Sequence, residues 1–167
     1  MVRVGLLGED DWAVFREIRL RSLLDSPDAF GSTYGEESSQ TERAWRDWAA
    51  GRWRGGVAAV FAGRAENGTA VGTATGAEYD AEPGVGYVYA MWVAPDARGA
   101  GVGRALLDAV ETWARGRGCD RLALTVTETN TVARAFYDTA GFVESGERSP
   151  LRDRSRLLAV TMTKDLR

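Results

Sequence analysis

The sequence of 167 residues contains no histidine. This absence excludes Ser-His-Asp and Cys-His triads, two-histidine zinc sites, and imidazole as a general acid or base. The single cysteine, Cys119, excludes an internal disulfide and a cysteine-rich metal site, and we expect no bound metal. Chemistry in this chain must therefore use carboxylates, tyrosines, hydroxyls and backbone amides.

Long apolar runs and an excess of positive charge are also missing. Val4–Leu7 is too short for the core of a signal peptide, and no stretch of about 18 apolar residues occurs. The net charge is −3, so no general positive field attracts nucleic acid or acidic lipid. We therefore expect a cytoplasmic protein that binds neither nucleic acid nor membranes.

The length fits one domain, because domains typically contain about 50 to 250 residues. No repeat or linker interrupts residues 1–167. Apolar spacing predicts helices at 10–24, 41–50, 102–115 and 130–139. It predicts strands at 2–6, 57–64, 70–79, 85–93, 122–127, 142–146 and 156–163. The sequence thus predicts one α/β (α+β) domain with a mixed sheet of about six to seven strands and about four helices.

The most informative segment is a glycine-rich turn between a predicted strand and a predicted helix, Arg98-Gly99-Ala100-Gly101-Val102-Gly103-Arg104. Its glycines let the backbone approach a ligand closely, and the N–H groups and dipole of the helix attract a phosphate or pyrophosphate. Arg98 and Arg104 can add charged hydrogen bonds. Walker and Rossmann patterns do not fit, because they need residues that this turn lacks. A turn without a ligand is the alternative.

Asn130 and Tyr137 form a second pair of interest. They stand seven residues apart in a predicted helix, so their side chains lie within about 20° of one helix face. Asn130 also fits a helix N-cap, and Tyr137, close to Phe136 and Phe142, also fits a core position. Spacing alone leaves both alternatives open.

Together these motifs resemble the GCN5-related N-acetyltransferase (GNAT) superfamily. Arg98-x-x-Gly101-x-Gly103, after Met91-Trp92-Val93-Ala94-Pro95, is similar to its acyl-CoA signature. Asn130 and Tyr137 resemble its closing motif, and the loop Ser26–Ser32 is similar to a common acceptor-side loop. The match is close from Val85 to Phe142, and the order of elements fits the whole chain.

The resemblance implies a GNAT-like sheet that splays at its centre, between the strand ending at Val93 and the strand 122–127. Acetyl-CoA would enter this cleft as cosubstrate. Tyr137 would give a proton or hydrogen bond to the departing CoA thiolate. Relatives are often dimers, so the resemblance allows a homodimer. The implied cofactor-binding residues are Met91, Trp92, Val93, Arg98, Gly99, Ala100, Gly101, Val102, Gly103, Arg104, Asn130 and Tyr137.

The acceptor amine must lose a proton before it attacks. An alkylammonium has a pKa of about 10.4, so presenting the free amine at neutral pH costs roughly 4.6 kcal/mol. Tyr87 stands where many relatives carry a glutamate base, which leaves Glu78 and Glu82 as the expected catalytic carboxylates, with Asp80 beside them and Glu36 and Glu37 as weaker candidates. Solvated surface positions for these carboxylates, or an acceptor of low pKa, are the alternatives.

Aromatic residues concentrated at 26–54 and 79–87 predict the acceptor side of the cleft, although large aromatics are most often core. The acids at 78–82 favour a cationic acceptor. Three functions follow: N-acetylation of a small-molecule amine, which we prefer, acetylation of a protein N-terminus or lysine, and acyl-CoA binding without turnover. The expected substrate-binding residues are Phe30, Ser32, Tyr34, Tyr79 and Tyr87.

Overall fold

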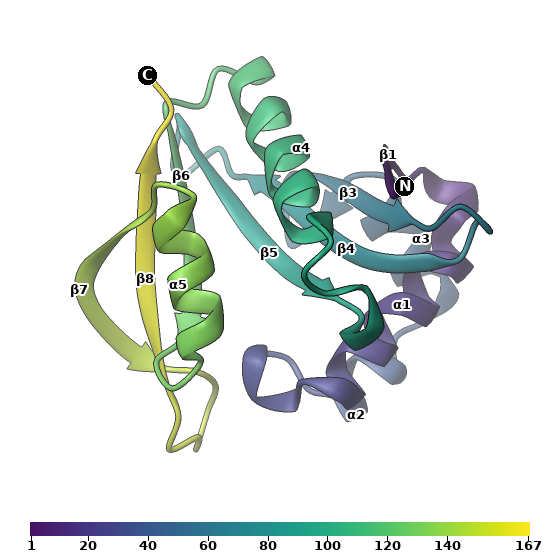
Figure 1. Ribbon diagram of the computed structural model, residues 1–167, viewed down its shortest axis with the longest axis horizontal. Coiled ribbons are helices and arrows are strands. Elements are labelled where there is room, and N and C mark those ends of the chain that lie inside the picture. Colours follow the sequence, from purple (N-terminus) through teal and green to yellow (C-terminus); the bar gives the residue numbers. More distant parts are fainter.

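The computed structural model describes residues 1–167 and contains one mixed eight-stranded sheet (Figure 1). Across the sheet the strands lie in the order β1 (Arg3–Leu6), β3 (Gly56–Arg64), β4 (Ala70–Glu78), β5 (Val85–Val93), β6 (Arg121–Thr127), β8 (Leu158–Asp165) and β7 (Val143–Pro150), and β2 (Arg52–Trp53) pairs with β3. Only the contact between β5 and β6 is parallel. The predicted α/β class with a mixed sheet is confirmed.

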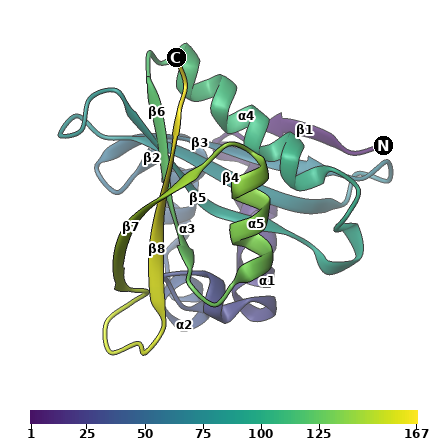
Figure 2. The same cartoon turned by 60° about the vertical axis from the view of Figure 1, so that its left-hand side comes forward.

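Five α-helices cover the two faces of this sheet: α1 (Trp12–Asp25), α2 (Tyr34–Ser38), α3 (Glu42–Ala49), α4 (Val102–Gly116) and α5 (Thr131–Thr139). Figures 1 and 2 show α4 on one face of β3–β5 and α1 and α3 on the other. None of the helices combines the length and the apolarity that a membrane crossing requires.

Each face of the sheet has its own hydrophobic core. Leu106 and Val110 of α4 pack in one cluster with residues of β6 and β8, and Phe15 of α1 packs in the other with residues of α3 and β3. Side chains alternate along a strand, so Val60 of β3 joins the second cluster while its neighbour Phe61 packs against the first. The sheet between the two cores is thereby fixed from both sides.

The sheet opens in its middle. β5 and β6 are in register only at Val85–Arg121, Gly86–Leu122 and Tyr87–Ala123, and beyond Tyr87 they diverge (Figure 1). In the diverging part, Ala90 and Met91 of β5 oppose the single residue Ala74 of β4, which is a β-bulge, and Ala90 has a φ of 53°. The predicted central splay is confirmed, and it leaves one edge of β5 without a neighbouring strand.

The structure contains one more strand and one more helix than the spacing predicts. β2 forms a hairpin with β3 through Arg54 and Gly55, whose φ values of 52° and 75° are typical of a two-residue type I′ turn. An Arg-Gly pair is a weak signal for this turn, so the sequence did not reveal β2. The five-residue helix α2 begins after Thr33, whose hydroxyl accepts a hydrogen bond from the N–H of Glu36.

One ion pair ties the last strand to α4. Lys164 of β8 donates from Nζ to Oε2 of Glu111 at 2.9 Å, and its side chain is 17% exposed. Arg115 donates to the other oxygen of Glu111 at 3.0 Å. The C-terminal half of α4 is thus held beside β8.

Candidate active site

The splay between β5 and β6 contains two connected cavities. One, which we call the glycine-turn cavity, has a volume of about 660 Å³ and is lined by the segment 97–104 and by β5 and α5. The other, which we call the Arg19 cavity, has a volume of about 400 Å³ and is lined by Arg19, by the β2–β3 turn and by β5 and β6. Residues that line both are Ala29, Phe30, Met91, Asn130, Ala133 and Tyr137. The two cavities therefore form one cleft with Tyr137 at their junction.

The start of α4 presents a row of free backbone amides to the glycine-turn cavity. The first α4 amide to be paired is that of Ala105, which donates to the carbonyl oxygen of Gly101 at 3.0 Å, and no N–H from Gly99 to Arg104 donates to a protein group. Gly99 and Gly101 have φ values of 81° and 84°, which favour glycine. This arrangement can bind a pyrophosphate.

The two arginines of the turn serve it in different ways. Arg98 donates from Nε to the carbonyl oxygen of Val93 at 2.9 Å and from Nη2 to Oδ2 of Asp25 at 2.9 Å. Asp25 also accepts from Trp92 Nε1 at 3.0 Å. Arg104 pairs with Asp108 one helical turn away at 2.9 Å. Arg98 thus fastens the turn to α1 and to the end of β5, while Arg104 lies half-exposed at the mouth of the cavity.

Hydrogen bonds from the Ser26 hydroxyl and the Trp92 indole hold the pKa of Asp25 below its ordinary value. A carboxylate with a lowered folded-state pKa stabilises the fold above its unfolded pKa, and this stabilisation disappears as the pH falls through the folded value. We expect Asp25→Asn to lower the free energy of unfolding at pH 7 by about 1–2 kcal/mol. The loss should be complete above about pH 4, near the unfolded pKa of aspartate, and it should shrink as the pH falls from there toward the lower folded-state pKa.

Urea unfolding between pH 3 and pH 7 measures this difference. Asp96→Asn is the matched control, because Asp96 is exposed in the turn before Arg98. It should unfold like the parent at every pH. An Asp25→Asn deficit that stays constant with pH would show that the carboxylate charge is irrelevant.

Tyr137 combines a buried ring with a hydroxyl at the cleft. Its ring packs edge-on against Phe136 and Phe142, with centroids 5.2 and 5.7 Å away. The residue lines both cavities, and its hydroxyl makes no hydrogen bond within the protein. Burial raises the pKa of Tyr137 far above its ordinary value, so the phenol keeps its proton at neutral pH.

Asn130 caps a helix and also lies at the cleft. Its Oδ1 accepts a hydrogen bond from the N–H of Ala133 at 3.1 Å, which caps α5. The residue also lines both cavities. The cap fixes the start of α5 at the cleft, and from there the helix carries Tyr137 two turns further along the same face.

The structure does not bring the two expected glutamates into the cleft. Glu78 is paired with Arg117 beyond the end of α4, and Glu82 accepts a hydrogen bond from the hydroxyl of Tyr87. Burial and this bond raise the pKa of Tyr87 to about 12. The hairpin that carries both glutamates lies at the closed end of the splay, where Tyr87 is still in register with Ala123. Neither glutamate lines a cavity of the cleft.

Of the five expected substrate-binding residues, two line the cleft and three do not. Phe30 and Ser32 line the Arg19 cavity, but Tyr34 lies 41% exposed beside α1, and Tyr79 packs against Tyr87 away from both cavities. Tyr87 does not line the Arg19 cavity, whereas Tyr89, two residues later and stacked on Tyr87, does. Sequence reasoning missed Arg19, Arg54 and Tyr89 as cavity residues.

Comparison with known proteins identifies the family. The model of the acetyltransferase (GNAT) family matches residues 17–142. An aminoglycoside N(6')-acetyltransferase type 1 of Klebsiella aerogenes is 41% identical over 71 residues, which is 40% of this chain and 47% of that protein. A mycothiol acetyltransferase of Stackebrandtia nassauensis is 29% identical over 142 residues, which is 84% of this chain and 44% of that protein. The chain thus spans less than half the length of these two relatives.

Solved structures agree at the level of the fold. The structure of a Salmonella typhimurium acetyltransferase with its cofactor acetyl-CoA superimposes with a TM-score of 0.78, at 20% identity and over 100% of this chain and 95% of that one. Because the family model spans most of the sequence, and the sheet opens between β5 and β6 beside a glycine-rich turn, the chain belongs to the acetyltransferase (GNAT) family.

Proposed function

We propose that the protein transfers an acetyl group from acetyl-CoA to a primary amine of a small molecule, by direct attack within a ternary complex. The observation that carries this proposal is the meeting of two cavities at one tyrosine. One cavity offers free amides for a pyrophosphate, the other is lined mainly by aromatic and apolar side chains together with two arginines, and Tyr137 lines both.

The donor half of the cleft is built from backbone. We assign the pyrophosphate to the amides of Gly99–Arg104 and the pantetheine arm to the open edge of β5 at Met91–Val93, with Asn130 opposite. Backbone amides that polarise the thioester carbonyl stabilise the charge that develops on its oxygen, and they need no special side chain.

In the transfer step, the amine nitrogen forms a bond to the thioester carbonyl carbon while the carbon–sulfur bond breaks. Tyr137 gives its proton to the departing sulfur. Water carries the proton that the amine loses back to the phenolate, because no aspartate or glutamate lines the Arg19 cavity. The guanidinium groups of Arg19 and Arg54 disfavour a second positive charge beside them, so they favour the neutral, reactive form of the amine.

The two alternatives have weaker support. Acetylation of a protein terminus or lysine requires a long groove, whereas the Arg19 cavity is compact, about 400 Å³, and is lined by Phe30, Ser32 and Leu151 as well as by β5. Acyl-CoA binding without turnover is favoured by the lack of a carboxylate in the cleft, but it gives no role to the protonated hydroxyl of Tyr137.

Thermal unfolding with acetyl-CoA and a free-thiol release assay test the proposal. Acetyl-CoA should raise the melting temperature by mass action, by an amount equivalent to about 2.7 kcal/mol at a hundredfold excess over Kd. Thiol release should then occur with small primary amines and be slower with peptides. No shift of the melting temperature at millimolar acetyl-CoA would refute acyl-CoA binding altogether. A shift without thiol release in the presence of any amine or peptide would favour acyl-CoA binding without turnover.

A further inference from the structure

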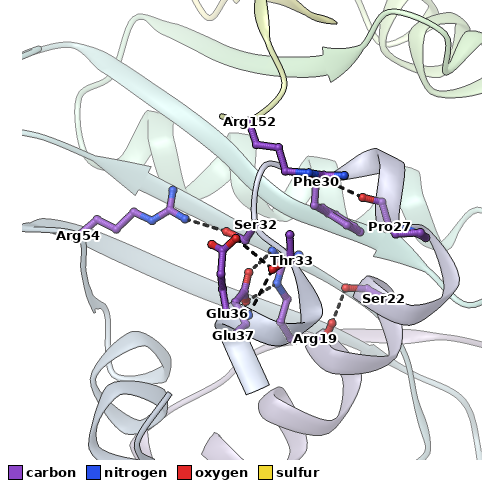
Figure 3. Close-up of polar contacts among 10 residues, drawn as sticks. All are labelled: Arg19, Ser22, Pro27, Phe30, Ser32, Thr33, Glu36, Glu37, Arg54 and Arg152. Carbon is purple, nitrogen blue, oxygen red and sulfur yellow. Dashed lines mark hydrogen bonds and ion pairs between the residues drawn. The ribbon is translucent and has the colours of Figure 1, made fainter. Parts of the chain in front are cut away.

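Arg19 of α1 lines the cleft, and one nitrogen of its guanidinium group has no hydrogen-bond acceptor. Its side chain is buried, with 4% of the residue exposed, and it lines the Arg19 cavity. Glu37 engages one edge of the guanidinium, at 2.8 Å from Nε and 2.7 Å from Nη2 (Figure 3). The ring of Phe30 lies against its face, 4.5 Å from Cζ. Nη1, which carries two N–H groups, has no partner. Buried donors without an acceptor are unfavourable, so this edge calls for one.

Arg54 supplies a second cation at the same cavity. It sits in the turn between β2 and β3 with a φ of 52°, which is strained for a residue other than glycine. Its guanidinium stacks over Trp53, 4.2 Å from the ring centroid, and its one hydrogen bond is to Ser32 Oγ at 3.4 Å (Figure 3). No carboxylate pairs with Arg54. The turn therefore holds an uncompensated positive charge at the cavity wall.

Glu37 balances the charge of Arg19, so the net positive charge of the cavity wall comes from Arg54. Arg19 and Arg54 are the charged residues that line the cavity, and no aspartate or glutamate does. Nearby, Glu37 is occupied by Arg19, Glu36 accepts from the Thr33 hydroxyl, and Arg152 donates to the carbonyl oxygen of Phe30 at 2.6 Å. The cavity is thus complementary to an anion, whereas the acids at 78–82 had favoured a cationic acceptor.

We propose that the acceptor is an amine that also carries a carboxylate, and that Arg19 Nη1 and the Arg54 guanidinium bind this carboxylate. This inference rests on the proposed function, because it describes the acceptor of that same cleft. A carboxylate accepts bonds from both guanidinium groups, and such charged hydrogen bonds are roughly twice as strong as neutral ones. Bound there, the acceptor has its amine free to reach toward Met91 and Tyr137, which the Arg19 cavity shares with the glycine-turn cavity.

The test compares glycine and each of the common L-amino acids except proline, whose amine is secondary, with its own carboxamide in the thiol release assay. For accepted skeletons, kcat/KM should be about 10- to 100-fold higher for the carboxylate, the range expected for hydrogen bonds to a charged group. The comparison is stringent, because an adjacent amide lowers the pKa of the amine and so increases its neutral fraction. Equal rates, or a preference for the carboxamides, would overturn the inference.

Two variants connect the preference to the arginines. Arg54→Gln should reduce the ratio of carboxylate to carboxamide kcat/KM about tenfold. Arg19→Met combined with Glu37→Leu should bring it close to one, and removing both partners avoids a lone buried carboxylate. Arg52→Gln is the matched control, since Arg52 is exposed, pairs with Asp47 and does not line the Arg19 cavity. It should keep the parental ratio.

The outcomes separate the two proposals. A melting shift with acetyl-CoA and thiol release without any carboxylate preference would overturn this inference alone, whereas no shift and no release would overturn the proposed function with it. If the double variant lacks a cooperative thermal transition, it is not folded. The inference is then tested by the ratio of carboxylate to carboxamide kcat/KM in the parent and in Arg54→Gln. If Arg54→Gln leaves the ratio of carboxylate to carboxamide kcat/KM unchanged, Arg54 does not bind the carboxylate. If the folded double variant leaves this ratio unchanged, Arg19 does not bind it.

Discussion

Gly103→Asp should weaken acetyl-CoA binding about 100-fold while the protein keeps its fold. Gly103 lies in the first turn of α4, on the wall of the glycine-turn cavity. A Cβ added there would lie 3.5 Å from Phe136 Cζ and 3.6 Å from Met91 Cε, which is ordinary van der Waals contact. The new carboxylate would stand among the amides that we assign to the pyrophosphate, and juxtaposed like charges cost several kcal/mol.

The sign of the stability change makes this prediction distinctive. An acidic residue in the first turn of a helix interacts favourably with the helix dipole, by about 0.3–1 kcal/mol. The Gly103→Asp protein should therefore resist urea slightly better than the parent while its Kd for acetyl-CoA, measured by calorimetric titration, rises. Gly103→Ala is the matched control and should bind within about threefold of the parent. Parental affinity in the aspartate variant would place the pyrophosphate elsewhere.

Tyr137→Phe should lower kcat about 100-fold, within the range that general acid catalysis contributes. The substitution removes only a hydroxyl that has no partner in the protein, so the packing against Phe136 and Phe142 and the Kd for acetyl-CoA should change little. Thiol release and direct titration measure the two quantities separately. Tyr34→Phe, outside the cleft, should leave both unchanged.

The pH dependence gives an independent check on Tyr137. Because burial raises the pKa of its phenol, the parent should show no falling limb of kcat that belongs to this group below about pH 10. An unchanged kcat in Tyr137→Phe would mean that the thiolate departs without help from this residue.

Local sequence patterns were sufficient for the donor half of the cleft. β5 spans Val85–Val93 as predicted, because nine residues that are apolar on both sides fit only a central strand. The helix after the glycine turn begins at Val102 as predicted, since left-handed Gly101 stands directly before it. A site built from backbone amides uses residues that are consecutive in the chain, and for that reason a local sequence pattern can indicate it.

The acceptor half depends on pairs that are distant in the sequence. Arg19 and Glu37 are 18 residues apart, and Arg152 donates to the carbonyl oxygen of Phe30 across 122 residues. No periodicity reports such a pair. The prediction of Glu78 and Glu82 as bases was wrong for the same reason. Both residues precede β5 closely in the chain, but they lie at the end of the splay where β5 and β6 are still paired. Where a carboxylate sits along a hairpin does not reveal which end of a splayed sheet it faces.

The contact between Lys164 and Glu111 has a chemical consequence if the protein handles a reactive thioester, as we propose. Thioesters acylate exposed neutral amines without an enzyme, but an ammonium nitrogen has no lone pair to attack with. Lys164 is the only lysine of the chain, and its ammonium is largely covered and held by Glu111. Twenty arginines, whose guanidinium groups stay charged at any physiological pH, carry the remaining positive charge. The side chains of this protein therefore offer the proposed thioester donor almost nothing to modify, so their charges should survive long exposure to an acylating reagent.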